Sequence, residues 1–77
     1  MELHRLIKMA NEIGGFFAQM PREEAISGTA AHLKNFWEPR MRREIIDYAQ
    51  RDGGELHEIA RAAVLRLSNP PAPAQKP

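Results

Sequence analysis

A proline at position 39 constrains this chain more than any other residue. It stands in the string Phe36-Trp37-Glu38-Pro39-Arg40-Met41-Arg42-Arg43, which also holds the only tryptophan. The residue before a proline is pushed out of the helical region, whereas proline itself suits the first turn of a new helix. The string therefore predicts a corner where one helix ends at Glu38 and another begins at Pro39. An aromatic pair lies on one side of this corner and an arginine cluster on the other.

Two further breaks complete a helical pattern. Pro21 can open a second helix, and Gly53-Gly54 can supply a left-handed residue that ends a third. Apolar residues recur at three- and four-residue steps between these breaks, as on the buried face of a helix. The sequence predicts an all-α fold, a small bundle of about four short helices over residues 3–20, 21–37, 39–51 and 55–67. Residues 1–68 are expected to form one helical domain and residues 69–77 a disordered, proline-rich tail.

The apolar stripes define the expected core. Its members are Leu6, Ala10, Ile13, Phe17, Ile26, Ala30, Leu33, Ile45, Leu56, Ile59 and Ala63. The first helix carries a second apolar row, Met9, Ile13, Phe16 and Met20, so that about half of its circumference is apolar. This helix is either central to its own domain or uses one face for the core and one for another protein; both interpretations stay open. Gly14-Gly15 indicates a kink or a close approach of another helix.

The size of the chain favours a partner. A domain of 77 residues buries only about 60% of the surface that its unfolded form exposes. The chain has no cysteine, and its three histidines lie far apart in sequence, so disulfides and a metal site are not expected to reinforce the core. The net charge of +1 does not indicate a general polyanion binder. Neither a membrane span nor a secretory signal is expected, and we therefore expect a cytoplasmic protein.

The arginines of the corner differ in the partners that they find along their helix. Arg40 can pair with Glu44 and Arg43 with Asp47, each at a four-residue spacing. Arg42 has isoleucines at the corresponding positions and can reach only Glu38 locally. We expect Arg42 either to bond to a partner elsewhere or to lie solvated along the apolar surface.

No pattern in the sequence supports catalysis, because there is no phosphate-binding glycine loop, no cysteine nucleophile and no serine motif. The residues expected to bind a partner are Met9, Phe16, Met20, Phe36, Trp37, Pro39, Arg40, Met41, Arg42 and Arg43. An alternative is a free-standing helical regulatory or nucleic-acid-binding module that uses the Arg40–Arg43 basic corner. The many acids nearby argue against nucleic acid.

Several strings of this chain resemble one known family. They are Leu6-Ile7-Lys8-Met9-Ala10-Asn11-Glu12-Ile13, the Phe16-Phe17 pair, His32-Leu33 and Phe36-Trp37-Glu38-Pro39-Arg40-Met41-Arg42. Together with the Gly-Gly turn, they are similar to the delta subunit of soluble, NAD-dependent, molybdenum-containing formate dehydrogenases. The last string is specific, and the resemblance covers roughly residues 3–67. The proline-rich tail is outside the family's pattern.

The resemblance implies a non-catalytic accessory subunit in a hetero-oligomer. In that family the large alpha subunit holds molybdenum bis-guanine dinucleotide and iron-sulfur clusters, and other subunits hold further clusters, FMN and the NAD site. The delta subunit carries no cofactor and is linked to the assembly or activity of the complex. We therefore expect this chain to bind the large subunit and to support its assembly, cofactor loading or stability.

Overall fold

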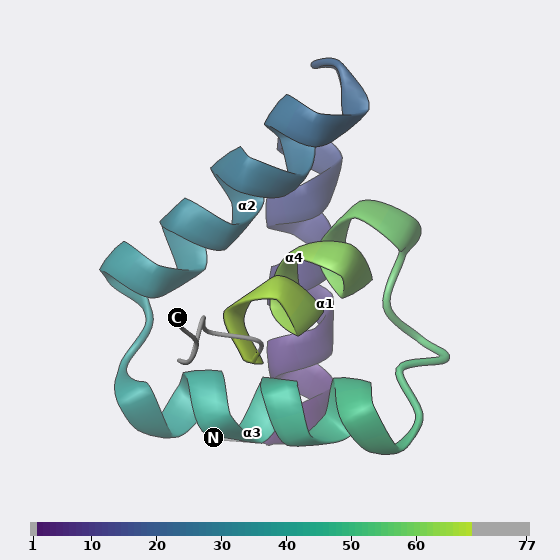
Figure 1. Ribbon diagram of the computed structural model, residues 1–77. Coiled ribbons are helices and arrows are strands. Elements are labelled where there is room, and N and C mark those ends of the chain that lie inside the picture. Colours follow the sequence, from purple (N-terminus) through teal and green to yellow (C-terminus); the bar gives the residue numbers. More distant parts are fainter. Residues whose placement is uncertain (1, 69–77) are drawn as a thin grey trace, which may run out of the picture.

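The structure is a computed structural model that describes residues 2–68. Its helices are α1 (Leu3–Phe17), α2 (Arg22–Phe36), α3 (Pro39–Arg51) and α4 (Glu58–Ser68). α1 and α2 diverge from the loop that joins them, and α3 crosses below them (Figure 1). No strand occurs among the described residues, and the all-α prediction is confirmed. The predicted tail, residues 69–77, lies outside the described residues.

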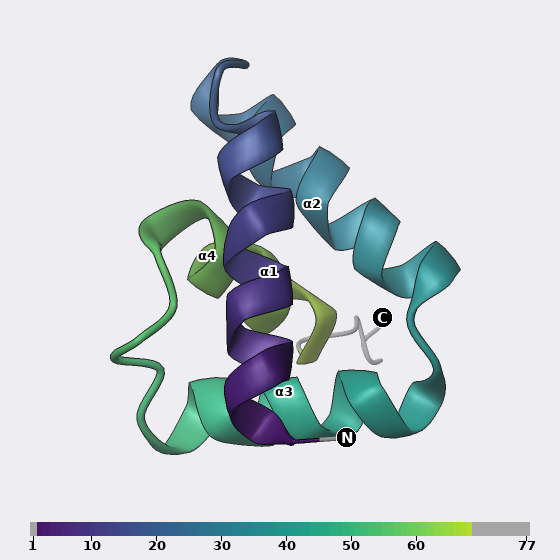
Figure 2. The same cartoon turned by 180° about the vertical axis from the view of Figure 1, so that it is seen from behind.

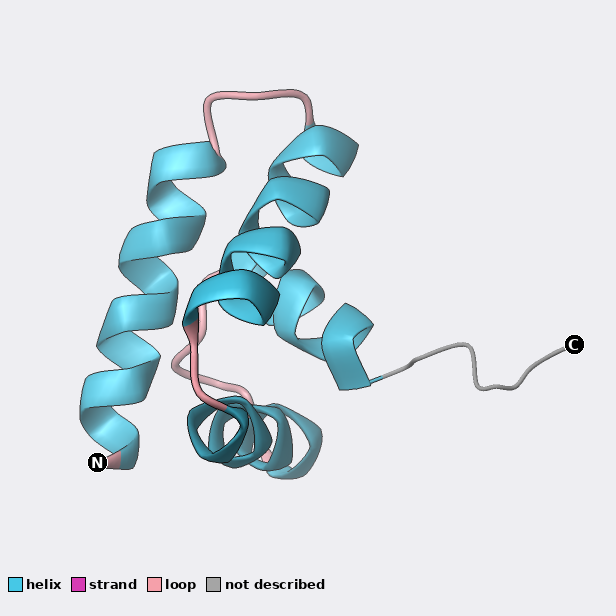
Figure 3. Ribbon diagram, turned by 90° about the vertical axis from the view of Figure 1, so that its left-hand side faces the viewer, coloured by secondary structure: helices cyan, strands magenta, loops and turns pink. Residues whose placement is uncertain are grey.

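α1 and α4 each contact all of the other helices, and the most extensive contact is between α2 and α4. From behind, α1 lies in front of α4, while α2 slants away from α1 (Figure 2). The side view shows α3 end-on, beneath the pair formed by α1 and α2 (Figure 3). Within residues 2–68, no helix is long and apolar enough to cross a membrane.

The helix breaks follow the predicted residues, except that the first helix ends at Phe17 and not at Met20. Pro21 is the N-terminal flanking residue of α2, and Pro39 is the first residue of α3. Gly53 has a φ of 70°, the left-handed conformation that ends α3. The predicted start of the last helix near residue 55 is wrong. The backbone makes a turn there first, in which the Leu56 N–H donates to the carbonyl oxygen of Gly53 at 3.1 Å, and α4 begins at Glu58.

Most of the predicted core is buried. The confirmed members are Leu6, Ala10, Ile26, Ala30, Leu33, Ile45, Leu56 and Ala63. Ile13, Phe17 and Ile59 are only partly buried, so their assignment to the core is corrected. For Ile13 and Phe17 the reason is that α1 and α2 meet near their connecting loop without a third helix to cover that side (Figure 2), and Ile59 lies in the first turn of α4.

Gly14 allows α1 and α4 to meet at their backbones. A Cβ atom at Gly14 would lie 3.1 Å from the backbone nitrogen of Ala60 and 3.2 Å from its Cβ, tighter than ordinary packing. At Gly15, by contrast, an added Cβ would meet nothing within 4 Å. The predicted close helix approach at the Gly-Gly pair is confirmed, and it belongs to Gly14.

The predicted ion pairs of α3 are wrong. Asp47 accepts from the Nε of Arg51, at 2.9 Å, and neither Arg40 nor Arg43 forms an ion pair within the described part of the chain. Arg51 lies one turn beyond Asp47, toward the helix C-terminus, which is the better order for an acid and a base on a helix.

Two other ion pairs join α2 to α4. Arg22 pairs with Glu58, and Arg66 pairs with Glu23 at 2.7 Å. The hydrogen bond and charge of Arg66 hold the pKa of Glu23 below its ordinary value, and the hydrogen bond to Glu23 raises the pKa of Arg66. All four side chains are exposed, so solvent screens both pairs and neither adds much to the stability of the fold.

Candidate partner-binding surface

Four rings form a continuous aromatic row across α1 and α2. The ring centroids of Phe16 and Phe17 are 5.2 Å apart and nearly perpendicular, at 86°. Phe17 lies 6.5 Å from His32, and His32 lies 4.7 Å from Phe36 at 38°. The aromatic row, Phe16, Phe17, His32 and Phe36, therefore runs from the end of α1 along α2.

The row ends in side chains that solvent reaches. Phe16 is 67% exposed and Phe36 is 73% exposed, and Met20, on the connecting loop, is 44% exposed. Scattered exposed apolar residues are ordinary, but a contiguous apolar patch on a small protein indicates a contact site. These three residues were predicted from the sequence to bind a partner.

The local geometry holds the middle of the row in place. Phe17 lies against Gly28 of α2, where an added Cβ would sit 2.7 Å from the Cδ1 atom of the ring. Next to it, a hollow of about 240 Å³ is lined by Glu12 and Ile13 together with the rings of Phe16, Phe17 and His32. The hollow and the exposed rings together form a surface that is mainly apolar, with one carboxylate at its edge.

The helix corner is built differently from the row. Trp37 is only 5% exposed and belongs to the main core cluster, so it faces inward. Pro39, Arg40 and Arg43 are exposed, while Met9 and Met41 are partly buried against the same core. The residues predicted to bind a partner thus fall into an apolar group at the row and a charged group at the corner.

Arg42 finds its partners inside the chain. Its Nη1 donates to the carbonyl oxygen of Lys34 at 3.1 Å and also to the carbonyl oxygen of Trp37. These acceptors belong to the chain itself, whereas the sequence predicted either a partner elsewhere or a solvated side chain. The signal that would have pointed to them is the end of α2, where no glycine caps the helix and the last carbonyl groups need donors.

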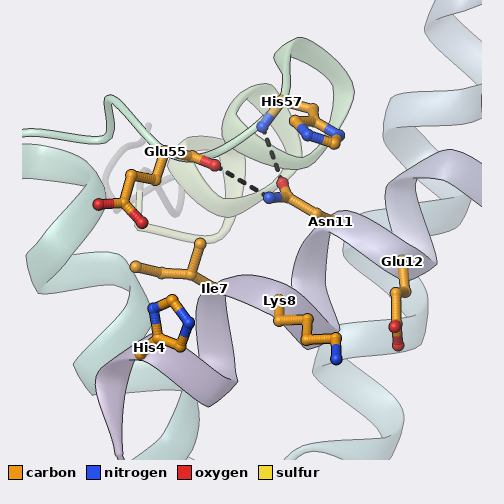
Figure 4. A pocket seen from close by; sticks show the side chains of 7 residues that line it. All are labelled: His4, Ile7, Lys8, Asn11, Glu12, Glu55 and His57. Carbon is orange, nitrogen blue, oxygen red and sulfur yellow. Dashed lines mark hydrogen bonds between the residues drawn. The ribbon is translucent and has the colours of Figure 1, made fainter.

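A second hollow, of about 410 Å³, lies between α1 and the loop before α4. Its lining, drawn in Figure 4, comprises His4, Ile7, Lys8, Asn11, Glu12, Glu55 and His57. Asn11 points at the loop: its Nδ2 donates to the Glu55 carbonyl oxygen at 2.9 Å, and its Oδ1 accepts from the His57 N–H at 2.8 Å. No role of Asn11 was predicted from the sequence. In the structure, its two hydrogen bonds fix the loop on α1.

The titratable residues do not gather into a metal site. Within residues 2–68, no group of three or more histidine, aspartate or glutamate side chains is arranged to hold a metal ion. The charges that line the larger hollow have both signs, and its histidines, His4 and His57, are exposed. The surface with the clearest chemical character is therefore the apolar aromatic row.

Fold and surface together define a small all-helical domain that presents an apolar face. The profile of the family described as NADH-dependent formate dehydrogenase delta subunit, FdsD, matches residues 5–64. The chain belongs to this family. The matched segment includes the aromatic row, the helix corner, Asn11 and the turn at Gly53. No curated protein and no solved structure matches the chain.

Proposed function

We propose that this chain is a non-catalytic accessory subunit of an NAD-dependent formate dehydrogenase. In this proposal it binds the large alpha subunit and supports its assembly, cofactor loading or stability. The observation that carries the proposal is the exposed aromatic row on a chain whose family is that of a delta subunit. Molybdenum bis-guanine dinucleotide, iron-sulfur clusters and FMN would belong to the partner subunits, and this chain would contribute protein contacts.

The row supplies the free energy that such a contact needs. Fully burying a phenylalanine side chain is worth about 1.5–3 kcal/mol, so covering the exposed part of Phe16 or Phe36 would contribute about 1–2 kcal/mol for each ring. Exposed aromatic and methionine side chains are typical of the residues that dominate protein interfaces. We therefore place the centre of the contact with the large subunit at Phe16, Met20 and Phe36.

The helix corner would lie at the rim of this contact or outside it. Trp37 is buried, so it cannot stack on a nucleic-acid base, and the guanidinium of Arg42 already bonds to two carbonyl groups. Only Arg40 and Arg43 of the basic corner stay open to a ligand. These features favour a protein partner over the alternative of a nucleic-acid-binding module.

The proposal is tested by retention of this chain in the enzyme complex. A tagged chain is co-expressed with the other formate dehydrogenase subunits, and the complex is passed over a sizing column. We expect wild-type chain to co-elute with the large subunit. Replacing both Phe16 and Phe36 by alanine should weaken the complex by about 2 kcal/mol or more, as for other central interface residues.

The matched control replaces two exposed arginines of the corner, Arg40 and Arg43, by alanine. Rim charges contribute little to affinity, so this variant should be retained like the wild type. A larger loss for the arginine variant than for the phenylalanine variant would reject the row as the contact. A wild-type chain that elutes alone, or that binds nucleic acid with a steep dependence on salt, would reject the proposed function.

A further inference from the structure

The C-terminus of α2 lacks the usual cap. A helix leaves its last four carbonyl groups without partners, and a glycine in the left-handed conformation commonly helps to satisfy them. Here Trp37 is extended, with φ −90° and ψ 142°, and Glu38 before the proline is extended as well, with φ −66° and ψ 152°. The chain therefore leaves the helix without the turn that would bring backbone donors to those carbonyls.

Arg42 supplies the missing donors. One nitrogen, Nη1, donates to the carbonyl oxygens of Lys34 and Trp37, which lie before and after Phe36 in the chain. A guanidinium nitrogen of this type carries two hydrogens in a fixed plane, so it can serve both acceptors at once. Its positive charge also opposes the partial negative charge at the end of a helix.

Phe36 depends on the part of the helix that Arg42 holds. Its ring is 73% exposed and rests on the imidazole of His32, 4.7 Å away, so few other contacts fix it. The last turns of helices fray, and a frayed turn would let the ring leave the aromatic row. The two carbonyl bonds of Arg42 bracket this turn on both sides of Phe36.

We propose that Arg42 is a positioning residue for partner binding. It holds the last turn of α2 so that Phe36 is presented at the end of the aromatic row, and it acts through Phe36 without contacting the large subunit. This inference rests on the proposed function, because the partner is the one that covers the row. It differs from the expectation that Arg42 itself bonds to the large subunit.

A double-mutant cycle in the enzyme complex tests the inference. Retention of the full chain is measured for Arg42→Ala, for Phe36→Ala and for the variant with both changes. If Arg42 acts through Phe36, each single change weakens retention by about tenfold, and the double variant is no weaker than Phe36→Ala alone. Arg43→Ala, which removes an exposed neighbouring arginine, is the control and should match the wild type.

Hydrogen exchange of the free full-length chain gives a second readout. The Trp37 N–H donates to the Leu33 carbonyl oxygen at 3.0 Å, and its exchange reports on the last turn of α2. Exchange at Trp37 should be faster in Arg42→Ala and unchanged in Arg43→Ala. If Arg42→Ala loses its helical circular dichroism, Arg42→Lys, which keeps the charge and loses the planar donor, replaces it in the cycle.

The outcomes separate the two proposals. Losses that multiply to about a hundredfold in the double variant would show that Arg42 contributes independently of Phe36, and would overturn the positioning role. Unchanged exchange at Trp37 in both Arg42 variants would overturn it as well. If wild-type chain is retained and Phe36→Ala has no effect, the row is not the contact; if wild-type chain is not retained, the proposed function itself fails.

Discussion

Two adjacent aromatic residues at the end of α2 should respond in opposite ways to truncation. Trp37 is 5% exposed and packs in the main core cluster, whereas Phe36 is 73% exposed. Replacing a buried tryptophan by alanine removes its burial and leaves a cavity, at a cost of about 3–5 kcal/mol. A chain of this length has a total stability of only about 4–10 kcal/mol. Trp37→Ala should therefore lower the free energy of unfolding by a large part of its total.

Thermal unfolding followed by far-ultraviolet circular dichroism measures this effect. In a domain of this size, each kcal/mol shifts Tm by about 4–8 °C, so Trp37→Ala should lower Tm by roughly 20 °C. Phe36→Ala is the matched control, because it removes a neighbouring ring that is largely in solvent. It should change the free energy of unfolding by less than about 1 kcal/mol.

At temperatures where both variants are folded, Phe36→Ala should weaken binding to the large subunit more than Trp37→Ala does. Phe36→Ala should impair binding to the large subunit more than its small effect on folding can explain. Similar Tm values for Trp37→Ala and Phe36→Ala would refute the assignment of one ring to the core and the other to the surface. A Trp37→Ala variant as stable as the wild type would do the same.

Three further predictions concern contacts that hold the fold. Gly14→Ala should destabilise the chain by about 1–3 kcal/mol in urea unfolding, because a Cβ there would crowd the backbone of α4. Gly15→Ala, on the open side of the same helix, should instead stabilise it by about 0.5–1 kcal/mol, and equal effects of the two changes would contradict the packing. Asn11→Ala should cost about 0.5–1.5 kcal/mol and speed amide exchange in the loop before α4, since two exposed backbone groups exchange their partner for water; unchanged exchange would show that the loop does not need it. The pKa of Glu23 is lowered by Arg66, so this pair should contribute stability above the ordinary glutamate range and lose it as pH falls through the folded-state pKa. Glu23→Gln should reduce the acid dependence of the urea midpoint, and an identical acid dependence in the variant would argue against the pair.

The helix breaks were predictable because they depend on local chemistry. A proline restricts its own backbone and the residue before it, so Pro21 and Pro39 mark helix starts without any tertiary information. Gly53 is similar, since the left-handed conformation that ends α3 favours glycine. The apolar spacing then placed most of the core correctly, with errors at Ile13 and Phe17 near the end of α1 and at Ile59 in the first turn of α4.

The contacts between distant segments were not predictable in the same way. Asn11 bonds to a loop more than forty residues away, and Arg42 bonds to carbonyl groups that every residue possesses. Backbone partners of this kind leave no signal in the pattern of side chains. The close approach of Phe17 to Gly28 also depends on how α1 and α2 cross, which periodicity does not specify.

The residues predicted to bind a partner were partly separable from the sequence. Phe16 and Met20 belong to the second apolar row that was predicted for the first helix, and the structure leaves both exposed. The corner string holds a buried tryptophan, two exposed arginines and one arginine that donates hydrogen bonds within the chain. The sequence pattern alone does not distinguish these three environments. The sequence predicted one partner-binding surface, and in the structure the predicted residues lie partly at the aromatic row, partly at the helix corner and partly in the core.

The most direct measurement is an amide hydrogen-exchange comparison of this chain, free and within the formate dehydrogenase complex. In the complex we predict added protection at the end of α1 near Phe16 and along α2 from His32 to Phe36, the segments that carry the aromatic row. Protection confined to residues 40–43, or an exchange pattern identical in the free chain and the complex, would contradict it.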